Sequence, residues 1–136
     1  MLKNTLSVHI SWGHCDPAKI VFYPNYFIWF DQSAHHLFDK AGANMGDLMD
    51  QYGVVGLPIV DAHAEFLYPS KYGDVIEVCS WISEWREKTL VATGINLTWV
   101  PAALSFVREI GWVAKRLSAS IEPWTHRFGP LVGTFQ

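Results

Sequence analysis

A long segment of helical periodicity with strand-like segments on either side constrains the fold of this chain more than any other feature. Apolar and aromatic residues recur every three or four positions over residues 24–41, as on the buried face of a helix. Pro24 suits the first turn of a helix, and Gly42 suits the position just after its end. The pattern therefore predicts a helix over 24–41 and a shorter one over 44–52, begun by Asn44.

The segments around this helix have the character of β-strands. Residues 5–12 alternate between apolar and polar side chains, which is the period of a half-buried strand. Further strands are expected over residues 58–68, 75–85 and 89–100 and within residues 104–115. Gly73-Asp74 and the charged Arg86-Glu87-Lys88 form turns between them. This order predicts an α+β fold in which the long helix packs on a five-stranded antiparallel sheet.

The whole chain, residues 1–136, is expected to form a single domain. Its length falls within the usual range for one domain, and 50% of its residues are hydrophobic, which excludes intrinsic disorder. The tail, residues 118–136, has no clear pattern. The predicted strands are apolar on much of both faces, while the helix covers only one face. A second copy of the chain is therefore expected to cover the other face.

Charge and cysteine content limit the partners and the compartment. The formal net charge is −3, so no basic excess draws the chain to nucleic acid or to an anionic membrane. No apolar run approaches the roughly 20 residues of a membrane span. Two cysteines make no disulfide framework, and the N-terminus lacks the apolar block of a signal peptide, so a cytoplasmic location is expected. Metal-binding spacings of His and Cys are absent, so neither a metal nor a redox cofactor is expected.

The loop over residues 13–25 is the best candidate for a catalytic site. Asp16 lies in this loop before a proline, and the loop leads into the predicted helix near Tyr23. Free N–H groups at a helix start can stabilise charge that develops on a carbonyl oxygen. A nearby carboxylate can attack that carbonyl or activate water. The alternative is that Asp16 merely stabilises a turn, as Asp before Pro often does.

Residues 13–26, GHCDPAKIVFYPNY, resemble the signature loop of hotdog-fold acyl-CoA thioesterases, in particular the 4-hydroxybenzoyl-CoA thioesterase type. The resemblance extends over about residues 6–100. It recurs in order at WFD (29–31), VGLPIV (55–60), YGD (72–74) and WREK (85–88). The order of one long helix before a run of antiparallel strands is also the hotdog order.

The resemblance implies an activity and a set of site residues. The reaction would be hydrolysis of an acyl-CoA thioester to a carboxylate and free CoA, without a cofactor, by a homodimer or homotetramer. The residue that corresponds to the catalytic nucleophile or general base is Asp16, and the backbone N–H of Tyr23 would polarise the thioester carbonyl. The resemblance assigns contacts with the acyl group to Asp31, Leu57 and Trp85. It assigns contacts with the CoA phosphates to Arg86 and Lys88.

Three departures from the family pattern bear on the substrate. Lys19 stands where these relatives often have glycine, and it could itself help to bind CoA. Leu57 stands where the 4-hydroxybenzoyl type has a hydroxyl residue, so a short aliphatic acyl group is an alternative to an aromatic one. The stretch after Val100 differs, and it offers only loose candidates for a further CoA contact: Arg108, Lys115 and Arg116.

Other interpretations remain open at this point. The chain could be a hotdog module that binds acyl-CoA or an acylated carrier without hydrolysing it. The helix motif of a dehydratase-type hotdog protein is not found. His14 could orient Asp16 or be structural, and Asp31 could lie in solvent. Glu65 is a spare catalytic carboxylate. Cys15 is a poor nucleophile because the neighbouring carboxylate disfavours its thiolate.

Overall fold

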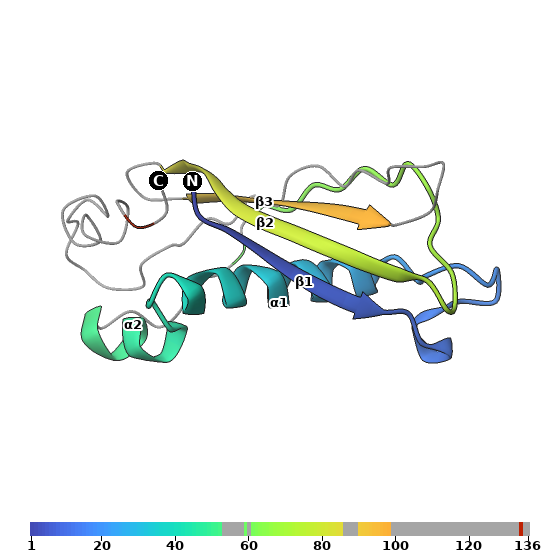
Figure 1. The fold of residues 1–136 in the computed structure, drawn as a ribbon, viewed down its shortest axis with the longest axis horizontal. Coiled ribbons are helices and arrows are strands. Elements are labelled where there is room, and N and C mark those ends of the chain that lie inside the picture. The colour runs from blue at the N-terminus through green and yellow to red at the C-terminus, as the bar shows by residue number, and fades with distance from the viewer. Residues whose placement is uncertain (53–58, 60, 86–89, 99–133, 135–136) are drawn as a thin grey trace.

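The computed structural model describes residues 1–52, 59, 61–85, 90–98 and 134. Their elements follow the order β1 (Lys3–His9), a 3-10 turn (Trp12–His14), α1 (Pro24–Lys40), α2 (Met45–Tyr52), β2 (Val75–Trp85) and β3 (Leu90–Thr98). The long helix α1 runs beneath the three strands, and α2 lies beyond its C-terminal end (Figure 1). One long helix before antiparallel strands is the predicted α+β arrangement.

The predicted long helix is present within one residue of its expected bounds. Pro24 occupies its first turn, where a missing N–H costs nothing. Gly42, just after the end of α1, has a φ of +73°, the left-handed conformation that glycine adopts most easily. Asn44 begins α2, because its side-chain oxygen accepts the Gly46 N–H at 2.9 Å.

The described sheet is antiparallel and has the order β1-β2-β3. The expected strand over 75–85 is confirmed, and that over 89–100 appears as β3. The strand expected over 5–12 is wrong at its end, since β1 stops at His9. There the chain turns away, because the Ser11 carbonyl accepts the His14 N–H at 3.1 Å and starts the 3-10 turn.

The expected strand over 58–68 is not formed in the residues that are described. Residue 59 and residues 61–68 have no strand conformation. An extended segment becomes a strand only when a neighbour accepts its backbone hydrogen bonds. Backbone pairing is seen just beyond this segment, where Val21 donates to the Ser70 carbonyl at 2.8 Å and Ile20 bridges Lys71. The strand expected within 104–115 lies outside the described residues, so the count of five remains a prediction.

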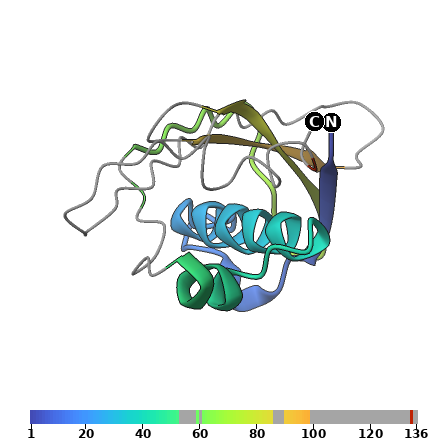
Figure 2. The same cartoon turned by 90° about the vertical axis from the view of Figure 1, so that its left-hand side faces the viewer.

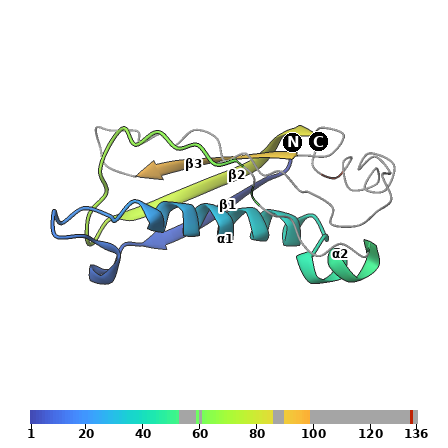
Figure 3. The same cartoon turned by 180° about the vertical axis from the view of Figure 1, so that it is seen from behind.

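The core lies between α1 and one face of the sheet, as the end-on and rear views show (Figures 2 and 3). Leu37 on α1 and Ile76 and Val78 on β2 are completely buried. The outer face of β1 is polar, as its alternating pattern predicts, because Lys3, Thr5, Ser7 and His9 are exposed there. Neither helix in the described ranges has the length and apolar character that crossing a membrane would require.

Candidate active site

Asp16 lies at the tip of a hairpin formed by residues 14–22, which we call the Asp16 hairpin. The Asp16 carbonyl accepts the Lys19 N–H at 2.9 Å, and the Asp16 N–H donates to the Ile20 carbonyl at 2.9 Å. Asp at the first position and Pro17 at the second are the favoured residues of such a turn. Lys19 follows in the left-handed region, with a φ of +63°, as the closing residue of a three-residue hairpin loop usually does.

The Asp16 carboxylate is held at one oxygen only. Its Oδ1 accepts the Ala18 N–H at 2.8 Å, which is the local bond that favours Asp and Asn in turns. Oδ2 has no hydrogen-bond or ion-pair partner among the residues that the structure describes. The turn therefore fixes the carboxylate and leaves one oxygen available to a ligand.

His14 ties the base of the Asp16 hairpin to the start of α1. Its carbonyl accepts both the Phe22 N–H and the Asn25 side-chain amide, each at 2.9 Å. Its ring Nδ1 accepts the Ser11 N–H at 3.1 Å, and the ring packs edge-on against Trp29 with 5.2 Å between centroids. His14 therefore holds the loop on the helix rather than contacting Asp16 by a hydrogen bond.

The backbone N–H of Tyr23 lies at the start of α1 and is unpaired. No described residue accepts a hydrogen bond from it, and the next residue, Pro24, has no N–H. The following N–H, that of Asn25, bonds back to the Phe22 carbonyl at 3.0 Å. An unpaired N–H at the positive end of a helix dipole can donate to an oxygen that gains negative charge.

Two pockets flank the Asp16 hairpin. The Asp16 pocket has a volume of about 350 Å³ and is lined by Trp12, Cys15, Asp16, Pro17, Lys19 and Tyr72. The Tyr23 pocket has a volume of about 640 Å³ and is lined by Ile20, Val21, Tyr23, Tyr26, Phe66, Tyr68 and Pro69. Asp16 and Tyr23 thus line two neighbouring pockets in one chain rather than a common one. The adjacent residues Lys19 and Ile20 separate the two.

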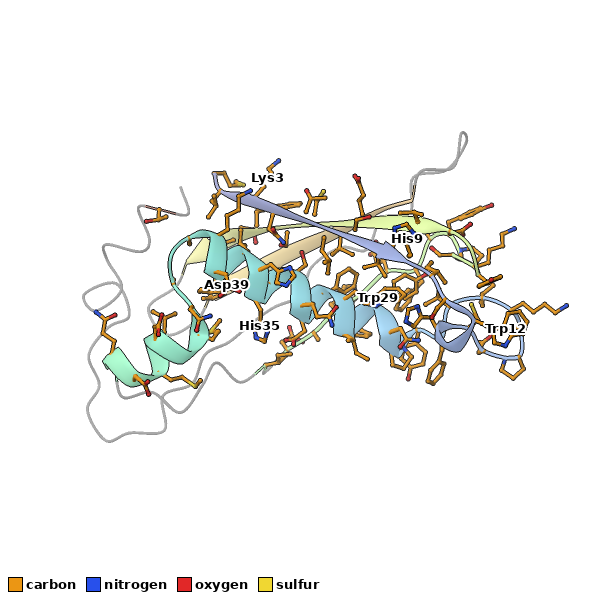
Figure 4. All side chains as sticks on the ribbon, turned by 60° about the horizontal axis from the view of Figure 1, so that its bottom comes forward. Lys3, His9, Trp12, Trp29, His35 and Asp39 are labelled. Atoms are coloured by element: carbon orange, nitrogen blue, oxygen red, sulfur yellow. The ribbon has the colours of Figure 1, made fainter. Side chains whose placement is uncertain are left out.

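The other predicted site residues lie elsewhere or cannot be placed. Asp31 on α1 lines neither pocket, and its Oδ2 lies 3.8 Å from Nδ1 of His35. His35 points away from the sheet (Figure 4). The backbone of Trp85 ends β2, at the opposite end of that strand from Val75. Leu57, Arg86 and Lys88 are outside the described residues.

The structure adds no support for a catalytic role of Glu65 or Cys15. Glu65 is exposed, and its Oε1 lies 4.0 Å from His63 Nε2. Cys15 and Cys79 are free thiols, and the Cys15 Sγ lies 3.9 Å from the Ser11 carbonyl oxygen. Within the described part of the chain, no three His, Cys, Asp or Glu side chains converge in a way that could hold a metal ion.

Sequence reasoning missed several aromatic residues that shape the two pockets. Trp12 was expected at the end of a strand, yet its exposed ring packs edge-on against Tyr72 with 5.6 Å between centroids. Phe66 holds segment 61–69 against α1, since its ring lies 5.5 Å from that of Tyr26 and 6.3 Å from that of Tyr23.

The fold and the site together define a class of protein. The long α1 packed on an antiparallel sheet, with a loop carboxylate at the start of that helix, is the hotdog architecture, and solved hotdog structures superpose on it. Residues 10–94 match the model of the Thioesterase-like superfamily. The chain belongs to this superfamily.

Individual relatives support the same assignment. The chain is 39% identical over 88 residues to 4-hydroxybenzoyl-CoA thioesterase of Pseudomonas sp. strain CBS-3. That match covers 64% of this chain and 62% of the relative, so it spans about three fifths of the relative's length. The solved structure of 4-hydroxybenzoyl-CoA thioesterase from the same strain superposes with a TM-score of 0.83 at 28% identity, over 96% of this chain and 99% of that one.

A second solved structure contains a ligand. It is an aspartate-to-asparagine mutant of 4-hydroxybenzoyl-CoA thioesterase in complex with 4-hydroxybenzoyl-CoA. It superposes with a TM-score of 0.78 at 25% identity and covers all of both chains.

Proposed function

We propose that this chain is an acyl-CoA thioesterase in which Asp16 is the catalytic carboxylate. The observation that carries the proposal is the presence of two groups, one on the Asp16 hairpin and one at the helix start that follows it. Asp16 lines a pocket, and one of its carboxylate oxygens has no partner among the residues that the structure describes. The Tyr23 N–H at the start of α1 likewise has no acceptor among them. An acid and an oxyanion donor are the minimal requirement for acyl transfer to water. The aspartate-to-asparagine mutant of the relative, solved in complex with 4-hydroxybenzoyl-CoA, adds support for an aspartate in the reaction.

The chemistry follows from these two groups. The Tyr23 N–H donates to the thioester oxygen as negative charge builds on it. Asp16 either attacks the carbonyl carbon itself or takes a proton from the attacking water. If Asp16 attacks, the C–S bond breaks as a mixed anhydride forms between the acyl group and Asp16, and water then hydrolyses that anhydride and restores the carboxylate. If Asp16 acts as a base, water adds to the carbonyl carbon and the C–S bond breaks directly. In both routes CoA leaves as a thiolate that takes up a proton, and the other product is the free carboxylate. The reaction needs no cofactor besides water.

The lead substrate is an aromatic acyl-CoA such as 4-hydroxybenzoyl-CoA. Trp12 and Tyr72 are exposed aromatic walls of the Asp16 pocket, and a volume of about 350 Å³ suits a single aromatic ring, because small-ligand pockets begin at roughly 300 Å³. We place the acyl group in this pocket and the pantetheine chain along the Tyr23 pocket. A short aliphatic acyl group remains the alternative, since Leu57 offers no hydroxyl to a polar ring substituent.

The proposed CoA contacts require a second copy of the chain. Asp16 lies near the Val75 end of β2, because the Ile20–Lys71 bridge joins its hairpin to the segment that leads into that strand. Trp85 ends the same strand ten residues on, roughly 33 Å away at 3.3 Å per residue. Arg86 and Lys88 follow Trp85, so we propose that they hold the CoA of a thioester bound at the partner's Asp16. The protein is then a homodimer or homotetramer.

The test is release of free thiol from a panel of thioesters: 4-hydroxybenzoyl-CoA, benzoyl-CoA and butyryl-CoA. We expect turnover of the aromatic thioesters above that of butyryl-CoA. Turnover of butyryl-CoA alone would move the substrate to short aliphatic acyl groups. If no thioester is hydrolysed but all of them bind in calorimetry, the chain is a binding module and Asp16 only forms its turn.

A further inference from the structure

Lys19 occupies a backbone conformation that its side chain disfavours. Its φ of +63° lies in the left-handed region, which costs an L-residue roughly 1 kcal/mol or more and which glycine adopts freely. No other described residue except glycine has a positive φ. Such outliers concentrate at functional sites, where the side chain has a use that offsets the strain. Here the side chain lines the same pocket as Asp16.

The ammonium group of Lys19 is available to a ligand. It forms no ion pair or hydrogen bond with any described residue, although the Asp16 carboxylate lines the same pocket. The pocket therefore holds one positive and one negative charge, and without Lys19 it would hold only the carboxylate. A negatively charged ligand would then be repelled by Asp16.

The chemical structure of an acyl-CoA thioester limits which of its negatively charged groups can reach the Lys19 ammonium. When the carbonyl carbon lies at Asp16, the pantetheine arm separates it from the CoA phosphates by far more than the length of a lysine side chain. The departing thiolate is attached to that flexible polar arm, which does not match the flat walls formed by Trp12 and Tyr72. An anionic substituent on an aromatic acyl ring fits all three side chains, because the ring packs on the aromatic walls and the charge meets the ammonium.

We propose that Lys19 is a specificity residue that selects aromatic acyl-CoA thioesters whose ring carries a negatively charged group. This inference rests on the proposed thioesterase function and narrows its substrate class. Lys19 offsets the Asp16 charge in the ground state and pairs with the ring substituent. The Trp12–Tyr72 pair holds the ring.

The test compares thioesters that differ only in charge. The pairs are 4-carboxybenzoyl-CoA with 4-carbamoylbenzoyl-CoA, and the two corresponding 3-substituted thioesters. In at least one pair, we expect wild-type kcat/KM to favour the carboxylate by about five- to tenfold, between the effect of an exposed ion pair and that of a charged hydrogen bond. Lys19→Met should reverse or abolish the preference, and Lys19→Arg should keep it. Raising the salt concentration should reduce the preference.

Lys71→Met is the matched control. Lys71 is an exposed lysine bridged to Ile20, and it does not line the pocket. It should leave the preference for the carboxylate unchanged. The proposal is overturned if the wild type does not distinguish charged from neutral thioesters. It is also overturned if Lys19→Met lowers kcat/KM equally for both members of a pair, which would place Lys19 at the CoA end.

A binding measurement separates this inference from the thioesterase function. The thioethers 4-carboxyphenacyl-CoA and 4-carbamoylphenacyl-CoA cannot be hydrolysed, and calorimetry gives their affinities directly. Tighter binding of the carboxylate that is lost in Lys19→Met supports the role of Lys19 even if no thioester is turned over. Equal affinities in the wild type together with normal hydrolysis of benzoyl-CoA would overturn this inference and leave the proposed function standing.

Discussion

The turn that contains Asp16 and the proposed hydrolysis make different demands on the Asp16 side chain. The turn needs an oxygen that accepts the Ala18 N–H at 2.8 Å, and asparagine supplies one equally well. Hydrolysis needs the carboxylate as a nucleophile or base, and an amide cannot replace it. The two roles can therefore be separated by substitutions that keep one oxygen and remove the charge.

Lys19→Gly should stabilise the folded chain, because glycine removes the steric penalty of a φ of +63°. The greater freedom of glycine in the unfolded state offsets part of the gain. We expect the free energy of unfolding in urea to rise by about 0.5–1 kcal/mol. Ala18→Gly, in the same turn, is the control and should be neutral or destabilising. A less stable Lys19→Gly variant would mean that the lysine stem contributes packing that outweighs the strain.

At the scale of elements, a buried polar network joins α1 to the strands. The Ser33 and Ser80 hydroxyls lie 2.8 Å apart, and both residues are buried. Asn4 on β1 donates to the Ser33 carbonyl at 3.1 Å, and Ser80 donates to the same carbonyl at 3.0 Å. The network links one turn of α1 to two strands and fixes the helix lengthwise on the sheet.

Ser33→Ala should destabilise the fold by about 1–2 kcal/mol, since the buried hydrogen bonds of the Ser33 hydroxyl with the Val78 carbonyl and the Ser80 hydroxyl are lost. Urea unfolding monitored by tryptophan fluorescence measures the change. Ser7→Ala, on the exposed outer face of β1, is the control and should shift the free energy of unfolding by less than about 0.5 kcal/mol. Equal effects of the two substitutions would contradict a role for the Ser33 network.

The elements that the sequence predicts best are those whose pattern is set locally. The periodicity of α1 and its end residues Pro24 and Gly42 predict the helix within one residue. The segment 58–68 has a strand-like pattern, but a strand also needs a neighbour in register. No pattern within the segment supplies that neighbour, and the structure gives none to residues 61–68.

In the candidate site, too, the sequence predicts the local features and not those that depend on distant residues. The loop motif predicts that Asp16 lies within a loop and Tyr23 at a helix start, but it does not predict the hairpin that has Asp16 at its tip. It does not predict that Tyr72, more than 50 residues later in the sequence, joins Trp12 in the wall of the Asp16 pocket. Nor does it predict that Lys19 adopts the left-handed backbone conformation that glycine favours. Both features depend on how distant segments meet in three dimensions.

At the scale of the whole molecule, the Asp16 hairpin and Trp85 lie near opposite ends of β2. The Asp16 hairpin and the start of α1 lie at one end, whereas Trp85 ends β2 at the other (Figure 1). Several large apolar side chains near the hairpin are exposed, among them Trp12, Phe22, Tyr23 and Tyr72. Such a patch on a single chain favours burial against another copy.

Mixing two inactive variants tests whether sites are shared between copies. Asp16→Asn should lack the catalytic carboxylate, and the double variant Arg86→Glu/Lys88→Glu should lack the CoA contacts. After unfolding and refolding together, mixed dimers contain one intact site, so up to about a quarter of wild-type activity should return. Each variant refolded alone is the control. No recovery, with mixed dimers present by mass spectrometry, would contradict a site shared between copies.

The most direct test of the central claim compares Asp16→Asn with Asp16→Ala and the wild type, by thiol release from the best substrate and by urea unfolding of the same samples. The account predicts that Asp16→Asn unfolds within about 0.5 kcal/mol of the wild type, because its amide oxygen still accepts the Ala18 N–H. Its kcat should fall at least about a hundredfold. Asp16→Ala should lose both activity and stability. An Asp16→Asn variant with wild-type kcat would contradict the account and leave Asp16 a residue of the turn alone.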